Sequence, residues 1–316
     1  MKKLLITRAM PDATIAAARL RFEVDLRKSV DGMMPDEAAA ALAAYDAILP
    51  TLGDQFTAAA FAGDIRCKVL ANFGVGYNHI DVKAARAAGV AVTNTPDAVT
   101  DATADIALTL ILSACRRAGE GERLVRSGLW LGWQPTQMLG THVTGKRLGI
   151  VGMGRIGQAV AKRCHYGFDM PVIYYNRSEK EVDVPSRQVE SLNALMSQAD
   201  IIVITVPGGG SNTNLISAEM IAEMQKTAVL VNVARGDVID EPALIAALQE
   251  GRIAAAGLDV YAREPLVPQE LRALENVVLL PHLGTAALEV REAMGQMAVD
   301  NLIAWADGTP LPQLVD

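Results

Sequence analysis

Short apolar runs alternate with alanine-rich stretches along the whole chain. In the first hundred residues the runs predict β-strands at Lys3–Thr7, Phe22–Leu26, Ala47–Pro50, Val69–Phe73 and Val90–Thr93. Helical patterns fall between them at Asp12–Leu20, Asp36–Ala44 and Val82–Ala88. Strands and helices that alternate at this spacing are typical of right-handed crossovers, so we predict a doubly wound parallel sheet.

A second series of the same kind begins at Arg147. Its predicted strands are Leu148–Val151, Val172–Tyr175, Ile201–Val206, Val229–Val233, Ala254–Asp259 and Val277–Leu280. Six strands separated by helices of about ten residues match a doubly wound unit with the strand order 3-2-1-4-5-6. A long helix at Asp101–Arg116, with Asp101 as its N-cap, is predicted between the two series. We expect a last helix, Glu289–Ala306, to pack on the first domain, which makes that domain discontinuous.

Composition narrows the class of protein. The chain of 316 residues is 51% apolar but only 4% aromatic, so an aliphatic core is expected, as suits helices packed on a parallel sheet. The formal net charge of −7 argues against nucleic acid as a partner, because phosphate binding needs an excess of Lys and Arg. Cys67, Cys115 and Cys164 form no C-x-x-C pair, and we expect buried thiols in a reducing compartment.

The sequence offers no candidate membrane segment. The N-terminus lacks the apolar stretch of a signal peptide. The most apolar helical stretch, Ile106–Cys115, is shorter than the ~20 residues that span a bilayer. We expect a soluble, cytoplasmic protein without membrane, nucleic-acid or metal partners.

A glycine-rich turn follows the first strand of the second series. Gly152, Gly154 and Gly157 form the pattern G-x-G-x-x-G between an apolar strand and an apolar helix. The first glycine permits a tight turn, the second lets backbone amides approach a pyrophosphate, and the third lets the helix lie close to the strand. The helix N-terminus adds unpaired N–H groups. We predict a dinucleotide site here, lined also by Arg155 and Ile156.

The residues after the next strand bear on the identity of the dinucleotide. NAD sites usually place Asp or Glu there to hold the ribose 2′-hydroxyl, but this chain has Asn176, Arg177 and Ser178. A guanidinium offers a charge-assisted fork to phosphate oxygens. This pattern favours NADPH, with NADH tolerated; the alternative is a solvated loop with an incidental Arg.

Three chemically active side chains follow the later strands. Arg235 comes after the strand at 229–233, Glu264 after the strand at 254–259, and His282 after the strand at 277–280. Ligands of open α/β sheets bind beyond the carboxyl ends of the strands. Reduction of a 2-oxo acid needs a cation for the carboxylate, a proton donor for the forming alkoxide and a carboxylate to orient an imidazole. Arg235, His282 and Glu264 match these needs in that order.

Together these residues resemble the D-isomer-specific 2-hydroxyacid dehydrogenase family over nearly the whole chain. The resemblance implies that Arg235 anchors substrate, that Glu264 and His282 form a proton relay, and that the backbone amides of Val75 and Gly76 hold the substrate carboxylate. It further implies cofactor contacts from Thr103, Pro207, Thr213, Val233, Ala234, Arg235, Asp259 and His282. Leu52, at the end of a first-domain strand, is expected to help set the size of the substrate side chain.

We therefore predict an α/β fold of two doubly wound parallel-sheet domains. A Rossmann cofactor domain at residues 100–287 is inserted into a discontinuous, flavodoxin-like substrate domain at residues 1–99 and 288–316. Within the family, the stretches 128–136 and 139–142 and the segment Asn176–Ser178 resemble glyoxylate/hydroxypyruvate reductases most. In the family the first stretch belongs to an arm that wraps a partner subunit, which implies a homodimer. Trp130 and Trp133 are expected either to pack in that interface or to contact substrate.

The prediction is thus an NADPH-preferring reductase of glyoxylate and hydroxypyruvate that forms D-2-hydroxy acids. Other D-2-hydroxyacid dehydrogenases, such as D-3-phosphoglycerate dehydrogenase, are an alternative. A non-catalytic nucleotide-sensing protein, similar to the corepressors built on this fold, is another, because such proteins can retain the Arg, Glu and His. Selectivity for one or two carbons is worth only ~1–3 kcal/mol, so the exact 2-oxo acid stays open. The three glycines at 208–210 depart from the bulkier residues usual in the family and leave the shape of that loop open.

Overall fold

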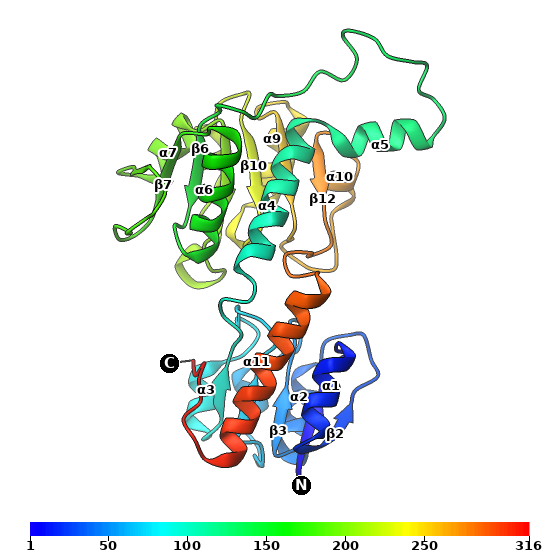
Figure 1. Ribbon diagram of the computed structural model, residues 1–316, viewed down its shortest axis with the longest axis vertical. Helices are drawn as coiled ribbons and strands as arrows, with labels where there is room; N and C mark the ends of the chain where they lie inside the picture. Colours follow the sequence, from blue (N-terminus) through cyan, green and yellow to red (C-terminus); the bar gives the residue numbers. More distant parts are fainter. Residues whose placement is uncertain (316) are drawn as a thin grey trace. The chain divides into compact units, whose positions relative to one another are not determined.

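The computed structural model describes residues 1–315 and divides into two compact units. The first unit comprises Met1–Val99 and the segment that begins at Thr285, and the second comprises Thr100–Gly284 (Figure 1). Each unit has its own sheet and its own apolar core.

The first unit contains a five-stranded parallel sheet in the order β2-β1-β3-β4-β5, which is the flavodoxin-like order. The strands are β1 (Lys2–Ile6), β2 (Phe22–Leu26), β3 (Ala47–Leu49), β4 (Val69–Ala71) and β5 (Ala91–Thr93). The helices are α1 (Asp12–Arg19), α2 (Pro35–Ala44), α3 (Val82–Ala87) and α11 (Leu288–Asp307), with a 3₁₀ turn η1 (Ala58–Phe61). All five strands and all four helices lie within two residues of their predicted bounds.

Alternate strand residues of this sheet face opposite layers of helices. Leu5, Ile48 and Leu70 are buried on the side of α2, while Leu4 and Leu49 are buried on the side of α1 and α11. The last helix packs against α1 and β4, as predicted. A Cβ at Gly295 of α11 would lie 1.9 Å from Oγ1 of Thr14, so the two helices approach closely.

The second unit contains a seven-stranded parallel sheet in the order β12-β11-β10-β9-β6-β7-β8. Its strands are β6 (Leu148–Val151), β7 (Val172–Tyr175), β8 (Ser186–Gln188), β9 (Ile201–Ile204), β10 (Val229–Asn232), β11 (Ala255–Leu258) and β12 (Val277–Leu279). The predicted count of six strands is wrong, because β8 was missed. The strand at Ile201 is therefore the fourth of this sheet and pairs with β6, and the sheet has the Rossmann order with one strand added beyond β11.

The missed strand carries no apolar signal. Its sequence is Ser-Arg-Gln, and it pairs only with β7 at the edge of the sheet. An edge strand faces solvent and needs few apolar residues, so hydrophobic patterning does not detect it.

Helices cover both faces of the second sheet. One layer holds α4 (Thr100–Cys115) and α6 (Arg155–Phe168), which pack on each other and on the strands (Figure 1). The elements α7 (Leu192–Gln198), α8 (Ala218–Ala222), α9 (Glu241–Gln249) and α10 (Gln269–Arg272) contribute to the opposite layer. The remaining elements are α5 (Ala118–Arg126), η2 (Gly210–Asn212) and η3 (Gly236–Val238).

The prediction that Asp101 is the N-cap of α4 is wrong, because the helix already begins at Thr100. Its carboxylate lies 2.9 Å from Nη2 of Arg163 in α6, and Asp105 lies 2.7 Å from Nε of the same residue. Two acidic residues near the start of α4 are thus paired with a cation of the neighbouring helix.

All three cysteines are buried, as predicted, and burial raises the pKa of Cys67 to about 12. Within residues 1–315, no helix is long and apolar enough to cross a membrane.

Candidate active site

The glycine turn has the geometry that its sequence predicts. Gly152 has φ +98°, and a Cβ there would lie 2.7 Å from Cγ1 of Val206. A Cβ at Gly157 would lie 2.4 Å from the carbonyl oxygen of Gly152, so this glycine allows α6 to begin directly against the turn. Thr205 of the neighbouring strand end donates its hydroxyl to the same carbonyl over 2.6 Å.

Gly154 differs from the other two glycines, because its surroundings are open. It is the exposed N-cap of the 14-residue helix α6, it has no side-chain cap, and a Cβ there would have no atom within 4 Å. The turn therefore presents backbone N–H groups and the positive end of the helix dipole to open space. These residues fit a pyrophosphate. Arg155 is exposed and Ile156 half-buried beside it.

A depression of about 440 Å³ follows the carboxyl end of β7. It is lined by Tyr175, Asn176, Arg177, Gln188, Val189 and Glu190. Asn176 is held inside its own loop, since its amide donates to the carbonyl of Ser178 over 2.7 Å and its carbonyl accepts from Gln188. Arg177 is exposed in the same depression. Sequence reasoning missed Glu190, which comes from the loop after the undetected strand β8 and brings a carboxylate close to the predicted 2′-phosphate site.

Arg235 follows β10 in a turn built by a buried Asn. Asn232, only 1% exposed, donates its amide to the carbonyl of Arg235 over 2.9 Å and accepts the N–H of Ala234 over 2.9 Å. Nη1 of Arg235 donates to the carbonyl of Ala234 over 2.7 Å. Burial lowers the pKa of Arg235, and the carboxylates of Glu264 and Asp237 oppose that effect. The turn thus holds a cation in a desolvated place, where it would attract an anion strongly.

The structure brings His282 and Glu264 together. Nδ1 of His282 lies 2.8 Å from Oε2 of Glu264, and the other oxygen, Oε1, accepts the N–H of Tyr261 over 3.0 Å. Burial alone raises the pKa of Glu264, but the hydrogen bond and the charge of His282 bring it below its usual value. An ionised carboxylate only accepts, so the proton of this bond lies on Nδ1 and leaves Nε2 for another partner.

Asp259 fixes the turn that carries His282. His282 has φ +56°, a left-handed conformation that is unusual for any residue but Gly. Asp259, 1% exposed, accepts the N–H of Leu283 over 2.6 Å and that of Gly284 over 2.8 Å, and its own carbonyl accepts from the N–H of His282. Burial raises the pKa of Asp259, while these N–H groups act in the opposite direction.

Two further residues support the same turn. The hydroxyl of Tyr261 donates to the carbonyl of Leu280 over 2.8 Å, two residues before His282. Burial raises the pKa of this phenol. Thr103 of α4 is also buried, and its hydroxyl donates to the carbonyl of Gly284 over 3.2 Å. Thr103 and Asp259, which we expected to line a cofactor, hold the backbone around His282 in this structure.

The other predicted contact residues of the second unit surround the same strand ends. Val233 and Ala234 are buried in the turn before Arg235. Pro207 and Thr213 are exposed at the two ends of the loop after β9. The amide of Asn212 donates to the carbonyl of Pro207 over 2.9 Å and so closes this loop.

The predicted substrate residues Leu52, Val75 and Gly76 lie in the first unit, at strand ends of its sheet. Asn72, fully buried, donates its amide to the carbonyls of Gly74 and Gly76, and Asn94 donates to the carbonyl of Val75. These bonds use the carbonyl groups of the loop as acceptors.

Sequence reasoning missed Asn232, Tyr261 and Glu190. Asn232 and Tyr261 stand next to a predicted site residue or within three positions of one, but an Asn at a strand end and an aromatic residue after it are ordinary features of a sheet. Only their hydrogen bonds to the backbone of Arg235 and of Leu280 distinguish them.

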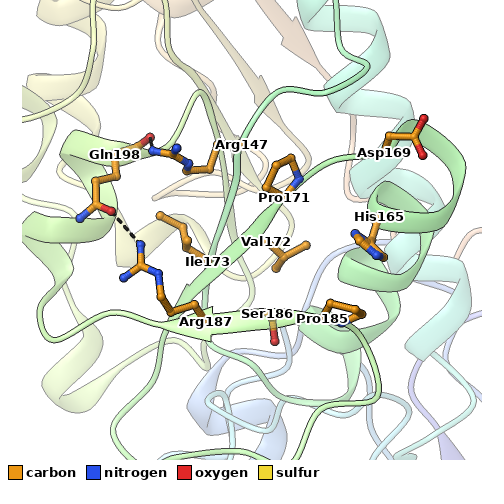
Figure 2. Close-up of a pocket in the computed structure, with 10 residues that line it drawn as sticks. All are labelled: Arg147, His165, Asp169, Pro171, Val172, Ile173, Pro185, Ser186, Arg187 and Gln198. Carbon is orange, nitrogen blue, oxygen red and sulfur yellow. Dashed lines mark hydrogen bonds between the residues drawn. The ribbon is translucent and has the colours of Figure 1, made fainter.

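The larger depression of the second unit, about 550 Å³, lies away from this site. Its lining includes Arg147, Pro171 and Ser186, at the amino ends of β6, β7 and β8 (Figure 2). The glycine turn and the Glu264–His282 pair follow the carboxyl ends of their strands. This depression therefore belongs to the opposite edge of the sheet and takes no part in the candidate site.

A Rossmann sheet with an open glycine turn and a Glu–His pair at neighbouring strand ends defines an NAD(P)-dependent oxidoreductase. The chain belongs to the D-isomer specific 2-hydroxyacid dehydrogenases, whose NAD-binding domain matches residues 108–284. It binds a nicotinamide cofactor through this domain.

Similar proteins cover nearly the whole chain. The glyoxylate reductase of Thermococcus kodakarensis is 42% identical over 99% of this chain and 96% of its own length. The glyoxylate reductase of Pyrococcus horikoshii is 41% identical over 99% of this chain and 96% of its own length. The NADPH-dependent glyoxylate/hydroxypyruvate reductase of Sinorhizobium meliloti, solved in complex with NADP and malonate, has a TM-score of 0.89 at 32% identity and matches 99% of this chain and 96% of that one.

Proposed function

We propose that this enzyme reduces glyoxylate to glycolate, which is achiral, and hydroxypyruvate to D-glycerate, with NADPH preferred and NADH tolerated. The observation that carries the proposal is the Glu264–His282 pair, set at neighbouring strand ends of the same unit as the desolvated Arg235. The names of the similar glyoxylate reductases support the choice of substrate.

Each protein group has a separate task in this reaction. Arg235 would hold the substrate carboxylate with its guanidinium fork and polarise the neighbouring carbonyl. In the first unit, the amide N–H groups of Val75 and Gly76 would donate to a substrate carboxylate, and Leu52 would limit the size of the side chain. His282 would give the proton on Nε2 to the oxygen that becomes the hydroxyl, and would remove that proton in the reverse direction.

Glu264 acts through His282. Its carboxylate accepts from Nδ1, which fixes the orientation of the ring and stabilises the imidazolium before the proton is transferred. The nicotinamide dinucleotide supplies the hydride when it is bound. The glycine turn would hold its pyrophosphate at the N-terminus of α6, with Thr103, Pro207, Thr213, Val233, Ala234 and Asp259 at the further cofactor positions.

The preference for NADPH rests on Arg177 and Ser178 in the depression after β7. A guanidinium pairs with a 2′-phosphate better than with a hydroxyl. Glu190 in the same depression acts in the opposite sense, because its carboxylate repels a phosphate and accepts from a ribose hydroxyl. We infer that this balance makes the enzyme prefer NADPH without excluding NADH.

One assay tests the proposal. Oxidation of NADPH and of NADH is followed with glyoxylate, hydroxypyruvate, pyruvate and phenylpyruvate, and the glycerate formed from hydroxypyruvate is analysed on a chiral column. We expect turnover with glyoxylate and hydroxypyruvate, and D-glycerate as the product of hydroxypyruvate. Absence of turnover with all four acids would overturn the proposal.

We further propose that the enzyme is a homodimer. The segment between α5 and β6 extends away from the sheet of its unit (Figure 1). In this segment Leu131 is 92% exposed and Trp133 is 80% exposed. Apolar side chains that cluster at such exposure mark an interaction surface. Light scattering after gel filtration should give the mass of two chains, and Trp133→Asp should lower it. Val30→Asp, at a side chain 85% exposed in the first unit, is the control and should not change it.

A further inference from the structure

The glycine loop after β9 lies directly against Arg235. A Cβ at Gly208 would be 2.7 Å from both Cβ and Cγ of Arg235, and 2.7 Å from Oδ1 of Asp237. Real side chains do not approach at this distance, so any residue larger than Gly at 208 would displace the stem of Arg235 or the loop itself. The departure from the bulkier residues usual in the family thus has a defined structural result.

Asp237 ties this loop to the turn that carries Arg235. Its Oδ2 accepts the N–H of Gly209 over 2.7 Å. Gly209 has φ +75°, a conformation that suits Gly, and the 3₁₀ turn η2 begins at the next residue. The carboxylate of Asp237 therefore stands at the point where the loop comes closest to the arginine.

The negative charge of Asp237 opposes the binding of an anion by Arg235, so its hydrogen bond to the loop calls for a structural explanation. A carboxylate close to Arg235 weakens the attraction of that guanidinium for an incoming anion. The backbone of Arg235 is held independently by Asn232, whose amide bonds its carbonyl over 2.9 Å. Asn232 does not fix the direction of the Arg235 side chain. The loop that contains Gly208 is the element packed against Cβ and Cγ of that side chain.

We propose that Gly208 and Asp237 are positioning residues that direct the guanidinium of Arg235: Asp237 holds the loop 207–213 in place, and the absence of a side chain at 208 lets that loop confine the stem of Arg235. This inference rests on the proposed function, in which Arg235 binds the substrate carboxylate. The fork of a guanidinium binds a carboxylate through two parallel bonds, so a rotation of its stem lowers affinity for the anion. Because Pro207 and Thr213 belong to the same loop, one segment serves both the cofactor and the substrate anchor.

Two matched pairs of variants test the proposal. Gly208→Ala places a methyl group on Arg235, whereas Gly210→Asn adds a larger side chain in the same loop, where nothing lies within 4 Å of the added Cβ and where Asn tolerates the left-handed φ of +56°. Asp237→Ala removes the carboxylate, whereas Asp237→Asn removes only the charge and keeps an oxygen that can accept from Gly209.

Four quantities are measured on the enzyme. These are the Kd of NADPH by fluorescence titration, the Kd of oxamate for the enzyme–NADPH complex by calorimetry, and the KM and kcat with glyoxylate. Oxamate is an unreactive analogue of a 2-oxo acid, so its affinity reports the carboxylate anchor without turnover. Gly208→Ala and Asp237→Ala should raise the Kd of oxamate and the KM for glyoxylate by about tenfold each. The Kd of NADPH should stay within about twofold of that of the unchanged enzyme. Gly210→Asn and Asp237→Asn should keep the oxamate affinity within about threefold.

Unchanged oxamate affinity in Gly208→Ala and Asp237→Ala would overturn the inference. An equal loss of NADPH and oxamate affinity would overturn it as well, because the loop would then serve the cofactor alone. If Asp237→Ala does not melt cooperatively, the comparison of Gly208→Ala with Gly210→Asn decides the matter. Failure of the proposed function looks different: the unchanged enzyme would not bind oxamate, or Arg235→Ala would bind it equally well.

Discussion

Nδ1 of His282 lies 2.8 Å from Oε2 of Glu264, although eighteen positions separate the two residues. They meet because β11 and β12 are parallel neighbours with Leu258 paired to Leu279, so that both following loops leave the same edge of the sheet. The left-handed backbone at His282 and the two oxygen acceptors of Asp259 then aim the ring at the carboxylate. Catalysis by this enzyme should depend on that contact in ways that can be measured.

Glu264→Gln should lower kcat with glyoxylate by roughly 10- to 100-fold. The amide can still accept from Nδ1, but it no longer stabilises the imidazolium, and a hydrogen bond to a charged group contributes about 1.5–3 kcal/mol. Steady-state kinetics measures kcat, and the Kd of NADPH should stay unchanged. An unaltered kcat would show that the carboxylate does not assist His282.

The same substitution should also change how stability depends on acid. The folded state lowers the pKa of Glu264 from its ordinary value of 4.5. A carboxyl group with a lowered pKa stabilises the fold above its unfolded pKa, and that contribution is lost as the pH falls through the folded value. Between pH 6 and pH 3, the free energy of unfolding of the unchanged enzyme should therefore fall more steeply than that of Glu264→Gln. Parallel curves from urea denaturation would contradict this.

His282→Ala should lower kcat by about 10²- to 10⁴-fold, the range that a positioned general acid contributes. The side chain of His282 is 30% exposed, so its removal should not unfold the protein. Stopped-flow oxidation of NADPH measures the loss, and fluorescence titration should show nearly intact NADPH binding. Full activity would refute its role as the proton donor.

Arg177→Ala and Glu190→Gln should shift cofactor preference in opposite directions. Removing the guanidinium should raise the Kd of NADPH by about tenfold, since only NADPH carries the 2′-phosphate. The Kd of NADH should change by less than about twofold. Removing the carboxylate charge should strengthen NADPH and weaken NADH. The Kd of each cofactor is measured for each variant. Equal losses for both cofactors in Arg177→Ala would mean that this residue does not bind the 2′-phosphate.

Gly157→Ala and Gly154→Ala should separate folding from cofactor binding. The added methyl group at 157 would lie 2.4 Å from a backbone oxygen, so it should destabilise the enzyme by about 1–3 kcal/mol. At 154 the methyl group meets no atom within 4 Å and φ is −82°, so stability should hold while NADPH binding weakens. Thermal melting and fluorescence titration measure the two effects. A stable Gly157→Ala or an unimpaired Gly154→Ala would contradict the respective prediction.

Much of this protein follows from local pattern. The apolar runs at Leu148–Val151 and Ile201–Ile204 form buried strands because each one must be covered on both faces, and Gly152 and Gly157 take the places where the backbone leaves no room for a Cβ. Arg235, Glu264 and His282 could be named from sequence, since titratable residues that follow parallel strands gather at one edge.

Only the tertiary structure decided the rest. The edge strand Ser186–Gln188 is polar because solvent satisfies one of its sides, and so the carboxylate of Glu190 was not expected near the cofactor loop. The contacts of Asp259 with the backbone of Gly284, and of Gly208 with the stem of Arg235, join segments that lie more than twenty positions apart. Periodicity reports which residues are buried and in which element. It carries no information on which loops meet, because that depends on strand order and on how closely the two backbones can pack.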